Sequence, residues 1–297
     1  MNRFVSGSLL LTLLLAPFVA VSATPISESR EANADVHVRI ENIAGSVEVR
    51  AGTGNRVEVT GSLGDGAKPL RIEGDGARMT IEVEPEGSGW GSSNMDDTQL
   101  VVTVPPGARI EVGTVSASVD VDGVNGSHAE VESVSGSIKF VADAQRVSLK
   151  SVSGNIDGQG AGNDWTVGTV SGRISLPQAS GDLSVESVSG SIEFAFGQAD
   201  RLRVETVSGR IVASGQLLPG GSVAMQSVSG SIGLTLNGAV DARINAKTFS
   251  GGIDSDFGTP ESGGIGGGKN LETRVGAGSA DIRLESFSGG IRISKGS

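Results

Sequence analysis

The sequence predicts an all-β protein folded as a parallel β-solenoid, a single-stranded β-helix with about 18–21 residues in each coil. Three observations lead to this fold class. The string S/T-V-S-G-x-I returns along the chain at nearly regular offsets, and β-branched residues alternate with polar ones around it. After residue 30, no segment has the apolar spacing of an amphipathic helix. We expect right-handed coiling, the usual hand of connections between parallel strands.

The first 23 residues predict a secretory signal peptide. Arg3 is followed by an apolar run over residues 9–21, and Val21-Ser22-Ala23 supplies the small residues of a cleavage site after Ala23. The run is short for an uncleaved membrane anchor, which needs about 20 residues. We therefore expect a periplasmic or secreted protein whose mature chain has no integral membrane span. Residues 24–35 are polar and without periodicity, so we expect a flexible leader there.

The repeat begins at nine aligned positions, where position 1 lies six residues before the second Ser of the motif. The copies start at Ile110, Ala129, Val147, Trp165, Leu183, Leu202, Val223, Ile244 and Ile282. Their offsets are 19, 18, 18, 18, 19, 21, 21 and 38 residues. Internal periods near 20 residues are typical of solenoids. The last offset is twice 19, which predicts one degenerate copy between Ile244 and Ile282.

An early copy, from Val38 to Val47, starts 72 residues before Ile110, or four times 18. This spacing predicts that residues 48–109 hold three diverged coils. The mature chain then divides into irregular N-terminal coils over residues 36–109 and regular repeats over residues 110–297.

Apolar residues occupy positions 1 and 3, and then positions 6, 8, 10 and often 12. A strand alternates strictly, so this shift predicts a corner near positions 4 and 5, with the residue at position 6 facing inward. A second corner is expected over positions 13–18, where turn residues collect. The glycine at position 8 is predicted to lie where a Cβ would crowd the stacked neighbour. These structural glycines are Gly136, Gly154, Gly172, Gly190, Gly209, Gly230, Gly251 and Gly289.

The hydroxyl residues at positions 5 and 7 are expected to face outward and to stack into a stripe. The favoured interpretation is that they cap the corners by bonding backbone groups. The alternative is a ligand-facing strip made of Ser135, Ser153, Ser171, Ser189, Ser208 and Ser229. Trp90, in a Gly- and Ser-rich loop, is a further candidate for ligand contact or for covering the solenoid, and the loop over residues 255–270 is another possible binding segment.

The composition excludes several kinds of chemistry. The chain has 297 residues with no Cys, 2 His and a net charge of -11. Thiolate metal sites, disulfides and Cys nucleophiles are therefore excluded, and an acidic chain is a poor binder of nucleic acid. We expect no catalytic residue, no metal and no cofactor.

Individual candidates for chemistry are weak. His37 and His128 have no evident nucleophile beside them, and Asp120-x-Asp122 lacks the Glu that would complete a calcium loop. Trp165 is at an inward position and is expected in the core. Glu186 and Glu205 occupy position 4 of adjacent coils, as a carboxylate pair of a β-helical polysaccharide lyase or hydrolase would. Mixed charges along that ladder favour a solvated face instead.

The repeat pattern of the chain resembles that of the bacterial putative adhesin family of β-strand repeats, a domain of unknown function. The resemblance is carried by Val104-Pro105-Pro106-Gly107-Ala108-Arg109-Ile110, by the V-S-G-x-I units that follow, and by the signal peptide, and it covers residues 35–297. It implies an exported protein of the cell envelope and brings no catalytic residues.

We therefore expect a non-catalytic scaffold or adhesin-like module that binds a surface, a glycan or a protein partner in the envelope. One alternative is a carbohydrate-active enzyme on a β-helix. Another is a purely structural rod that associates end to end.

Overall fold

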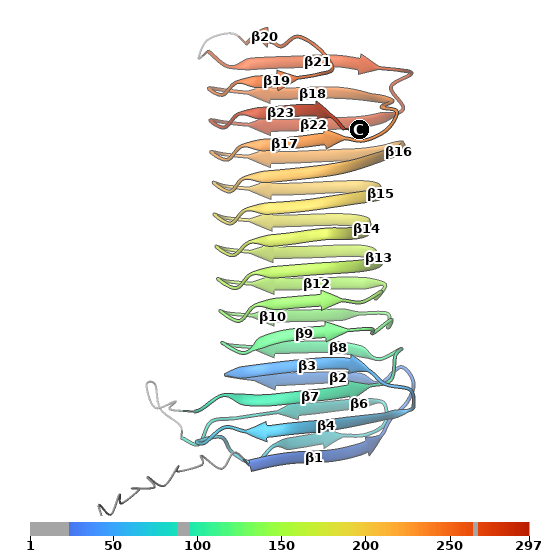
Figure 1. The fold of residues 1–297 in the computed structure, drawn as a ribbon, viewed down its shortest axis with the longest axis vertical. Helices are drawn as coiled ribbons and strands as arrows, with labels where there is room; N and C mark the ends of the chain where they lie inside the picture. Colours follow the sequence, from blue (N-terminus) through green and yellow to red (C-terminus); the bar gives the residue numbers. More distant parts are fainter. Residues whose placement is uncertain (1–23, 88–94, 264–266, 297) are drawn as a thin grey trace, which may run out of the picture.

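The computed structural model describes residues 24–87, 95–263 and 267–296 and confirms the β-solenoid (Figure 1). Each regular coil has one strand in a first wall, a tight corner, one strand in a second wall and a broad corner. The first-wall strands of the early coils are β2 (His37–Asn42), β6 (Arg78–Glu82), β8 (Arg109–Thr114), β10 (Ala129–Ser133) and β12 (Arg146–Ser151). Their second-wall counterparts are β3 (Gly45–Ala51), β7 (Thr98–Val104), β9 (Ser118–Asp122) and β11 (Ile138–Val141).

In the middle of the rod, single long strands run through the second wall, the broad corner and the first wall. They are β13 (Ile156–Thr169), β14 (Ile174–Ser187), β15 (Ile192–Thr206) and β16 (Ile211–Ser227). The late coils are built from β17 (Ile232–Leu236), β18 (Ala242–Thr248), β19 (Ile253–Ser255), β22 (Ala280–Ser286) and β23 (Ile291–Lys295). The ends carry β1 (Thr24–Glu31), β4 (Arg56–Leu63), β5 (Arg71–Gly74), β20 (Glu261–Ser262) and β21 (Lys269–Val275).

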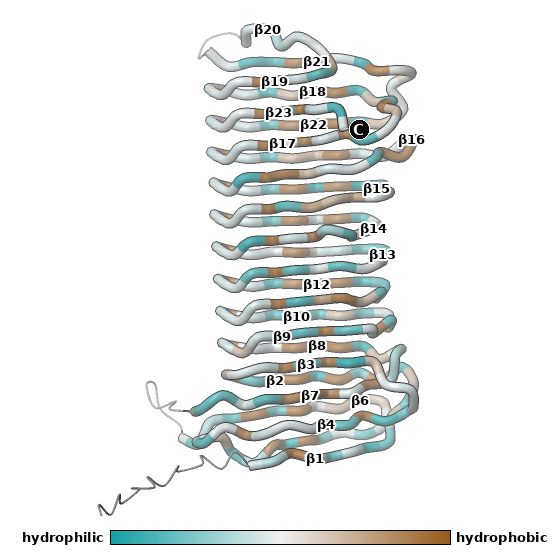
Figure 2. The backbone as a smooth tube through the Cα atoms, viewed as in Figure 1, coloured by the Kyte–Doolittle hydropathy of each residue, from teal (hydrophilic) through white to brown (hydrophobic). Residues whose placement is uncertain are grey.

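Equivalent repeat positions stack on one another, as the periodicity predicts. Val131 of β10 pairs in parallel with Val112 of β8 and with Leu149 of β12. Figure 2 shows the resulting alternation of hydrophobic and hydrophilic residues along the strands. The hydrophobic residues fill the space between the walls, where Trp165 packs edge-on against Phe140 with 5.6 Å between ring centroids. The prediction that Trp165 belongs to the core is confirmed.

At the tight corner, the side chains of positions 5 and 6 point in the opposite directions to those expected from the sequence. The Ser or Thr at position 5 is buried, whereas the Val or Phe at position 6 is about half exposed. The buried hydroxyl is needed inside because it accepts a hydrogen bond from the glycine N–H at position 8. Ser187 Oγ lies 2.9 Å from the Gly190 nitrogen, and the same bond recurs between Ser133 and Gly136 at 2.9 Å. The direction changes after position 5, so positions 6 and 7 both point outward.

The crowding predicted at the repeat glycines is present. A Cβ on Gly190 would overlap the carbonyl oxygen of Gly172 in the preceding coil, and each of the other repeat glycines meets an equivalent oxygen. Ala117 occupies this position in the first regular coil. The coil beneath it has a different corner, in which the Ile43 carbonyl accepts the Ala117 N–H at 3.2 Å.

The predicted order of the N-terminal coils is wrong. Val38 pairs directly with Ile110, so residues 48–109 do not form three coils stacked between them. Instead, β2 and β3 lie between β8–β9 on one side and β6–β7 on the other. The chain goes to the end of the rod with β4 and returns through β6 and β7, which leaves the first coil inside the stack. Spacing alone cannot distinguish these two routes.

The leader is also corrected, because residues 24–31 form β1 rather than a flexible segment. This strand pairs antiparallel with β4 over its whole length, from Thr24 opposite Leu63 to Glu31 opposite Arg56. Only Ile26 is buried within it. An edge strand held by backbone hydrogen bonds needs little apolar periodicity, which is why the sequence does not reveal it.

The C-terminal coils are likewise out of sequence order. Ile282 of β22 pairs with Val223 of β16 on one side and with Ile244 of β18 on the other. The last coil therefore lies between the two coils that precede it in the chain (Figure 1). Residues between Ile244 and Ile282 supply β19, β20 and the antiparallel strand β21, so no degenerate copy stacks between the two isoleucines.

Two predictions fall outside the described residues: the signal peptide over residues 1–23 and the candidate Trp90. Within the described ranges, no helix is long and apolar enough to cross a membrane.

Candidate functional site: a groove beside an exposed valine rail

The tight corners stack in a straight column along one edge of the rod (Figure 1). At position 6 they present a line of apolar side chains that are 45–57% exposed, which we call the valine rail. In order along the rod, the rail consists of Val115, Val134, Val152, Val170, Val188, Val207, Val228, Phe287 and Phe249. The two phenylalanine rings are stacked, with centroids 4.8 Å apart and planes 5° from parallel.

The backbone of the corner explains where the rail lies but not why it is apolar. The Val188 N–H donates to the Thr169 carbonyl of the preceding coil at 3.2 Å, and Val207 bonds Ser187 in the same way at 3.3 Å. These bonds aim the position-6 side chain away from the core. A polar residue that favours extended backbone, such as Thr, would fit this corner equally well, so the corner does not require an apolar side chain at position 6.

A groove runs beside the rail along most of the rod, with a volume of about 1470 Å³. The buried hydroxyl residues of position 5 line it together with the rail and the position-4 ladder. Its charged lining residues are Glu41, Glu82, Glu84, Glu132, Glu186, Glu205, Glu285, Lys150 and Lys247. Seven carboxylates and two ammonium groups leave this lining with a charge of -5.

Some of these charges are held by partners on the same wall. Lys150 donates to Glu132 at 2.9 Å, and this hydrogen bond is the main cause that raises the pKa of Lys150. Arg203, which lies outside the groove lining, forms an ion pair with Glu205. No ion pair of Glu186 or Glu285 occurs among the described residues.

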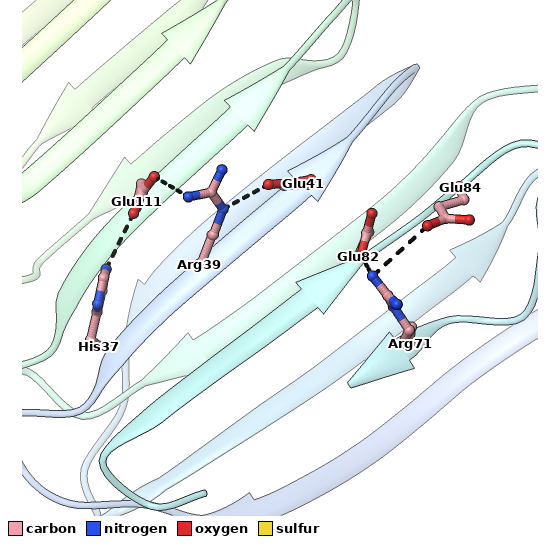
Figure 3. Close-up of polar contacts among 7 residues, drawn as sticks. All are labelled: His37, Arg39, Glu41, Arg71, Glu82, Glu84 and Glu111. Atoms are coloured by element: carbon pink, nitrogen blue, oxygen red, sulfur yellow. Dashed lines mark hydrogen bonds and ion pairs between the residues drawn. The ribbon is translucent and has the colours of Figure 1, made fainter. Parts of the chain in front are cut away.

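The N-terminal end of the groove carries a network of ion pairs (Figure 3). Arg39 donates to Glu41 at 2.6 Å and to Glu111 at 2.7 Å, and His37 Nε2 lies 3.4 Å from the other oxygen of Glu111. The hydrogen bond to Glu41 and the charge of Glu111 raise the pKa of Arg39.

A second pair in the same view joins Arg71 to Glu82, which raises the pKa of Arg71. The neighbouring Glu84 is hydrogen-bonded by Lys68 at 2.6 Å, and this bond is the main cause that lowers the pKa of Glu84. Glu41, Glu82 and Glu84 line the groove, whereas Arg39, Arg71 and Lys68 are not part of its lining.

The serine ladder at position 7 lies on the other side of the rail and is exposed. Ser135 donates to the Val115 carbonyl at 3.2 Å and Ser189 to the Val170 carbonyl at 3.2 Å, so these hydroxyls bond the backbone of the preceding coil. Each oxygen keeps acceptor capacity toward solvent. A ligand role for this ladder stays a prediction.

The other candidates are scattered rather than gathered at one place. Glu186 and Glu205 pair in register on adjacent coils and border the open groove. Asp120 lies in strand β9 and accepts from Lys139 at 2.9 Å. His128 lies 3.6 Å from Glu130. In the part of the chain that the structure describes, no group of three or more His, Cys, Asp or Glu could hold a metal ion.

The rail was not predicted as a surface. Its residues are apolar at a fixed repeat position, and that pattern is typical of a core. The available signal was the alternation that begins at positions 1 and 3, because its strict continuation places position 5 inside and position 6 outside.

Several solved structures are similar to this chain at low sequence identity. No curated protein matches the chain. A lipid binding protein described as putative, from Parabacteroides distasonis, is similar in structure, with 17% identity, a TM-score of 0.47 and coverage of 92% of this chain and 97% of the other. A putative adhesin from the same organism has 16% identity and a TM-score of 0.44, covering 72% and 97%. A putative adhesin from Bacteroides fragilis has 11% identity and a TM-score of 0.40, covering 92% and 98%.

The family itself is shown by a match over nearly all of the described chain. Residues 36–294 match the family model described as Toastrack DUF4097. The expected membership in a family of unknown function is thereby confirmed: the chain belongs to the Toastrack DUF4097 family.

Proposed function

We propose that this protein is a non-catalytic scaffold of the bacterial cell envelope, exported from the cytoplasm, that binds a macromolecular partner along the valine rail. The observation that carries the proposal is the rail itself: nine half-exposed apolar side chains in one unbroken line. Contiguous apolar surface on a folded protein marks an interaction site more often than an isolated exposed side chain does.

Folding does not require the exposed half of the rail. The rail residues follow one another from coil to coil, and about half of each side chain is buried. The remaining surface faces solvent in every regular coil. A chain under selection for stability and solubility alone would be expected to mix polar residues into this ladder, as it does at position 4 with Glu, Lys and Gln.

Export is supported by the signal-peptide pattern that ends at Ala23 and by the absence of Cys from the chain. A non-catalytic role is supported by the shape of the groove. Glu186 and Glu205 border an open surface, and Arg203 neutralises one of them. A retaining glycosidase uses both carboxyl groups on its substrate, one as acid and one as nucleophile, whereas here Glu205 is held by Arg203.

The test uses purified residues 24–297 with three probes: peptidoglycan fragments, a panel of envelope polysaccharides, and phospholipid vesicles with or without anionic lipid. Binding is measured by titration, and each mixture is analysed for cleavage products. The rail variant carries Val170→Ser and Val188→Ser. The matched control is Val212→Ser, which changes a valine that is 42% exposed on the second wall, outside the groove.

We expect saturable binding without cleavage products, at least tenfold weaker in the rail variant and unchanged in the control. Released products would contradict the proposal and make Glu186→Gln and Glu205→Gln the next variants. Export is tested separately, by cell fractionation and by mass spectrometry of the mature N-terminus. Retention in the cytoplasm with residues 1–23 attached would contradict the envelope assignment.

A further inference from the structure

We propose that the valine rail binds a second copy of this chain, so that two rods lie side by side and parallel. The inference rests on the proposed function in that it takes the rail to be a binding surface, and it names the occupant. Three properties of the rail support it: its period, its area and the charges on its two sides.

The period of the rail matches another solenoid better than it matches other linear partners. Stacked coils repeat about every 4.8 Å, so the rail is about 38 Å long. An amphipathic helix presents one apolar residue per turn of about 5.4 Å, and over eight steps it drifts by a whole coil. An extended strand presents same-face residues about every 6.7 Å and loses register within two coils. A second rail has the same repeat along its full length.

The apolar area is close to what a stable dimer needs. Nine side chains of roughly 150–200 Å², each about half exposed, present about 700 Å² on one copy. A standard interface buries about 800 Å² per partner. Contacts from the flanking ladders would supply the remainder. The stacked rings of Phe249 and Phe287 at one end differ from the valines and would set the register of the two rods.

Charges on the two sides of the rail favour the parallel arrangement. A two-fold axis along the rods places the position-4 ladder of one copy opposite positions 7 and 9 of the other, at equal height. Position 7 is Ser in every coil from Ser116 to Ser288, so this ladder places no negative charge opposite the carboxylates. The charged residues at position 9 are Arg173 and Arg210, both exposed and without an ion pair among the described residues.

One of these two arginines lies at the height of its acidic partner, and the other lies one coil below its partner. Arg210 belongs to the same coil as Glu205, and Arg173 belongs to the coil beneath Glu186. Parallel rods would therefore bring Glu205 of each copy to Arg210 of the other. In an antiparallel pair, the acidic position-4 ladder of one copy would instead lie opposite the same ladder of the other. The two groove linings, each with a charge of -5, would then repel each other.

The experiment measures the mass of residues 24–297 by sedimentation equilibrium over a range of concentrations. We expect a dimer whose dissociation constant rises at least tenfold with Val170→Ser plus Val188→Ser and stays unchanged with Val212→Ser. A monomer at every concentration overturns the proposal. A dimer that the rail variant does not weaken overturns it as well.

A charge exchange tests the parallel geometry. Glu205→Arg alone and Arg210→Glu alone each place like charges together at both symmetric contacts, so each variant should dimerise at least tenfold more weakly. In an equimolar mixture of the two variants, both contacts again join opposite charges, and heterodimers should form with nearly the original strength. Melting curves of each variant check that it is folded. If mixing does not restore association, the parallel side-by-side arrangement is wrong.

The outcomes separate this inference from the proposed function. A chain that stays monomeric yet binds peptidoglycan, polysaccharide or vesicles through the rail overturns self-association and leaves the proposed function standing. A rail-dependent dimer that releases products from polysaccharide would retain the self-association and refute the non-catalytic role.

Discussion

At the scale of single residues, the fold depends on a hydroxyl and a glycine at each tight corner. The hydroxyl of position 5 satisfies the N–H of the glycine at position 8, and that glycine leaves room for the carbonyl of the coil below. The two residues act together, and the motif T/S-V-S-G is the sequence of this corner.

Replacing Gly190 with Ala should destabilise the protein by about 2–3 kcal/mol, because the new Cβ would overlap a backbone oxygen that cannot move without shifting the coil. The matched control is Gly168→Ala, where a Cβ would have no heavy atom closer than 3.9 Å. Urea unfolding of both variants measures the difference. Equal midpoints for the two variants would refute the crowding argument.

Ser187→Ala should cost about 1–2 kcal/mol, because it leaves the Gly190 N–H buried without an acceptor. Ser189→Ala, two residues further on, removes an exposed hydroxyl and should change the free energy of unfolding by less than about 0.5 kcal/mol. Thermal and urea unfolding distinguish the two. A larger loss from Ser189→Ala would show that the exposed ladder, rather than the buried one, holds the corner.

Hydrogen bonding by the Ser279 side chain and by the Gly278 N–H, at 2.6 Å from Asp241 Oδ1, lowers the pKa of Asp241. A carboxyl with a lowered pKa stabilises the folded state above the unfolded pKa of about 3.9, and that stability is lost as the pH falls through the folded value. Asp241→Asn should therefore lower the melting temperature at pH 7, with a smaller difference at pH 3. A difference that does not shrink in acid would contradict this.

At the scale of elements, the C-terminal coil behaves as an internal one. Because β22 and β23 lie between β16–β17 and β18–β19, a chain that ends at residue 279 loses the support of everything beyond β17. We expect residues 237–279 to unfold together in this truncation. Limited trypsin digestion should then cleave at Arg243 and Lys247, which the full chain protects. Continued protection of both sites would show that β18 stacks without β22.

At the scale of the whole molecule, both ends of the rod stop the parallel stacking. The strands β1, β4 and β21 run antiparallel to their neighbours, and β1 exposes charged residues such as Glu28 and Arg30 along its edge. Such an edge resists the addition of another chain. This arrangement counts against the end-to-end rod and is compatible with association through the side.

Removing residues 24–31 should convert the chain into one that aggregates, because the backbone edge of β4, with Val57 and Val59, loses its partner strand and becomes available for pairing. Light scattering against concentration measures this. The rail variant Val170→Ser plus Val188→Ser should not suppress it, because a different surface is involved. A truncated chain that behaves like the full chain would show that β1 is not the cap of this end.

Much of the architecture follows from the sequence by itself. The offsets of 18–21 residues determine the coil, and the β-branched positions determine that Val, Ile and Leu fill the core. The glycine that recurs at position 8 predicts a place where a Cβ would crowd the neighbouring coil. These are local and repeated features, and stacking identical positions converts them directly into structure.

Tertiary structure decided the order of the coils and the side on which the rail lies. The pairing of β2 with β8, and of β22 with β18, joins segments that are far apart in the chain. The spacing of the repeats does not indicate these long-range pairings. The rail is exposed because a buried Ser or Thr must reach the glycine N–H, which turns the next residue outward. Hydrophobicity indicates what a residue prefers, whereas the hydrogen bonds of the corner decide where it points.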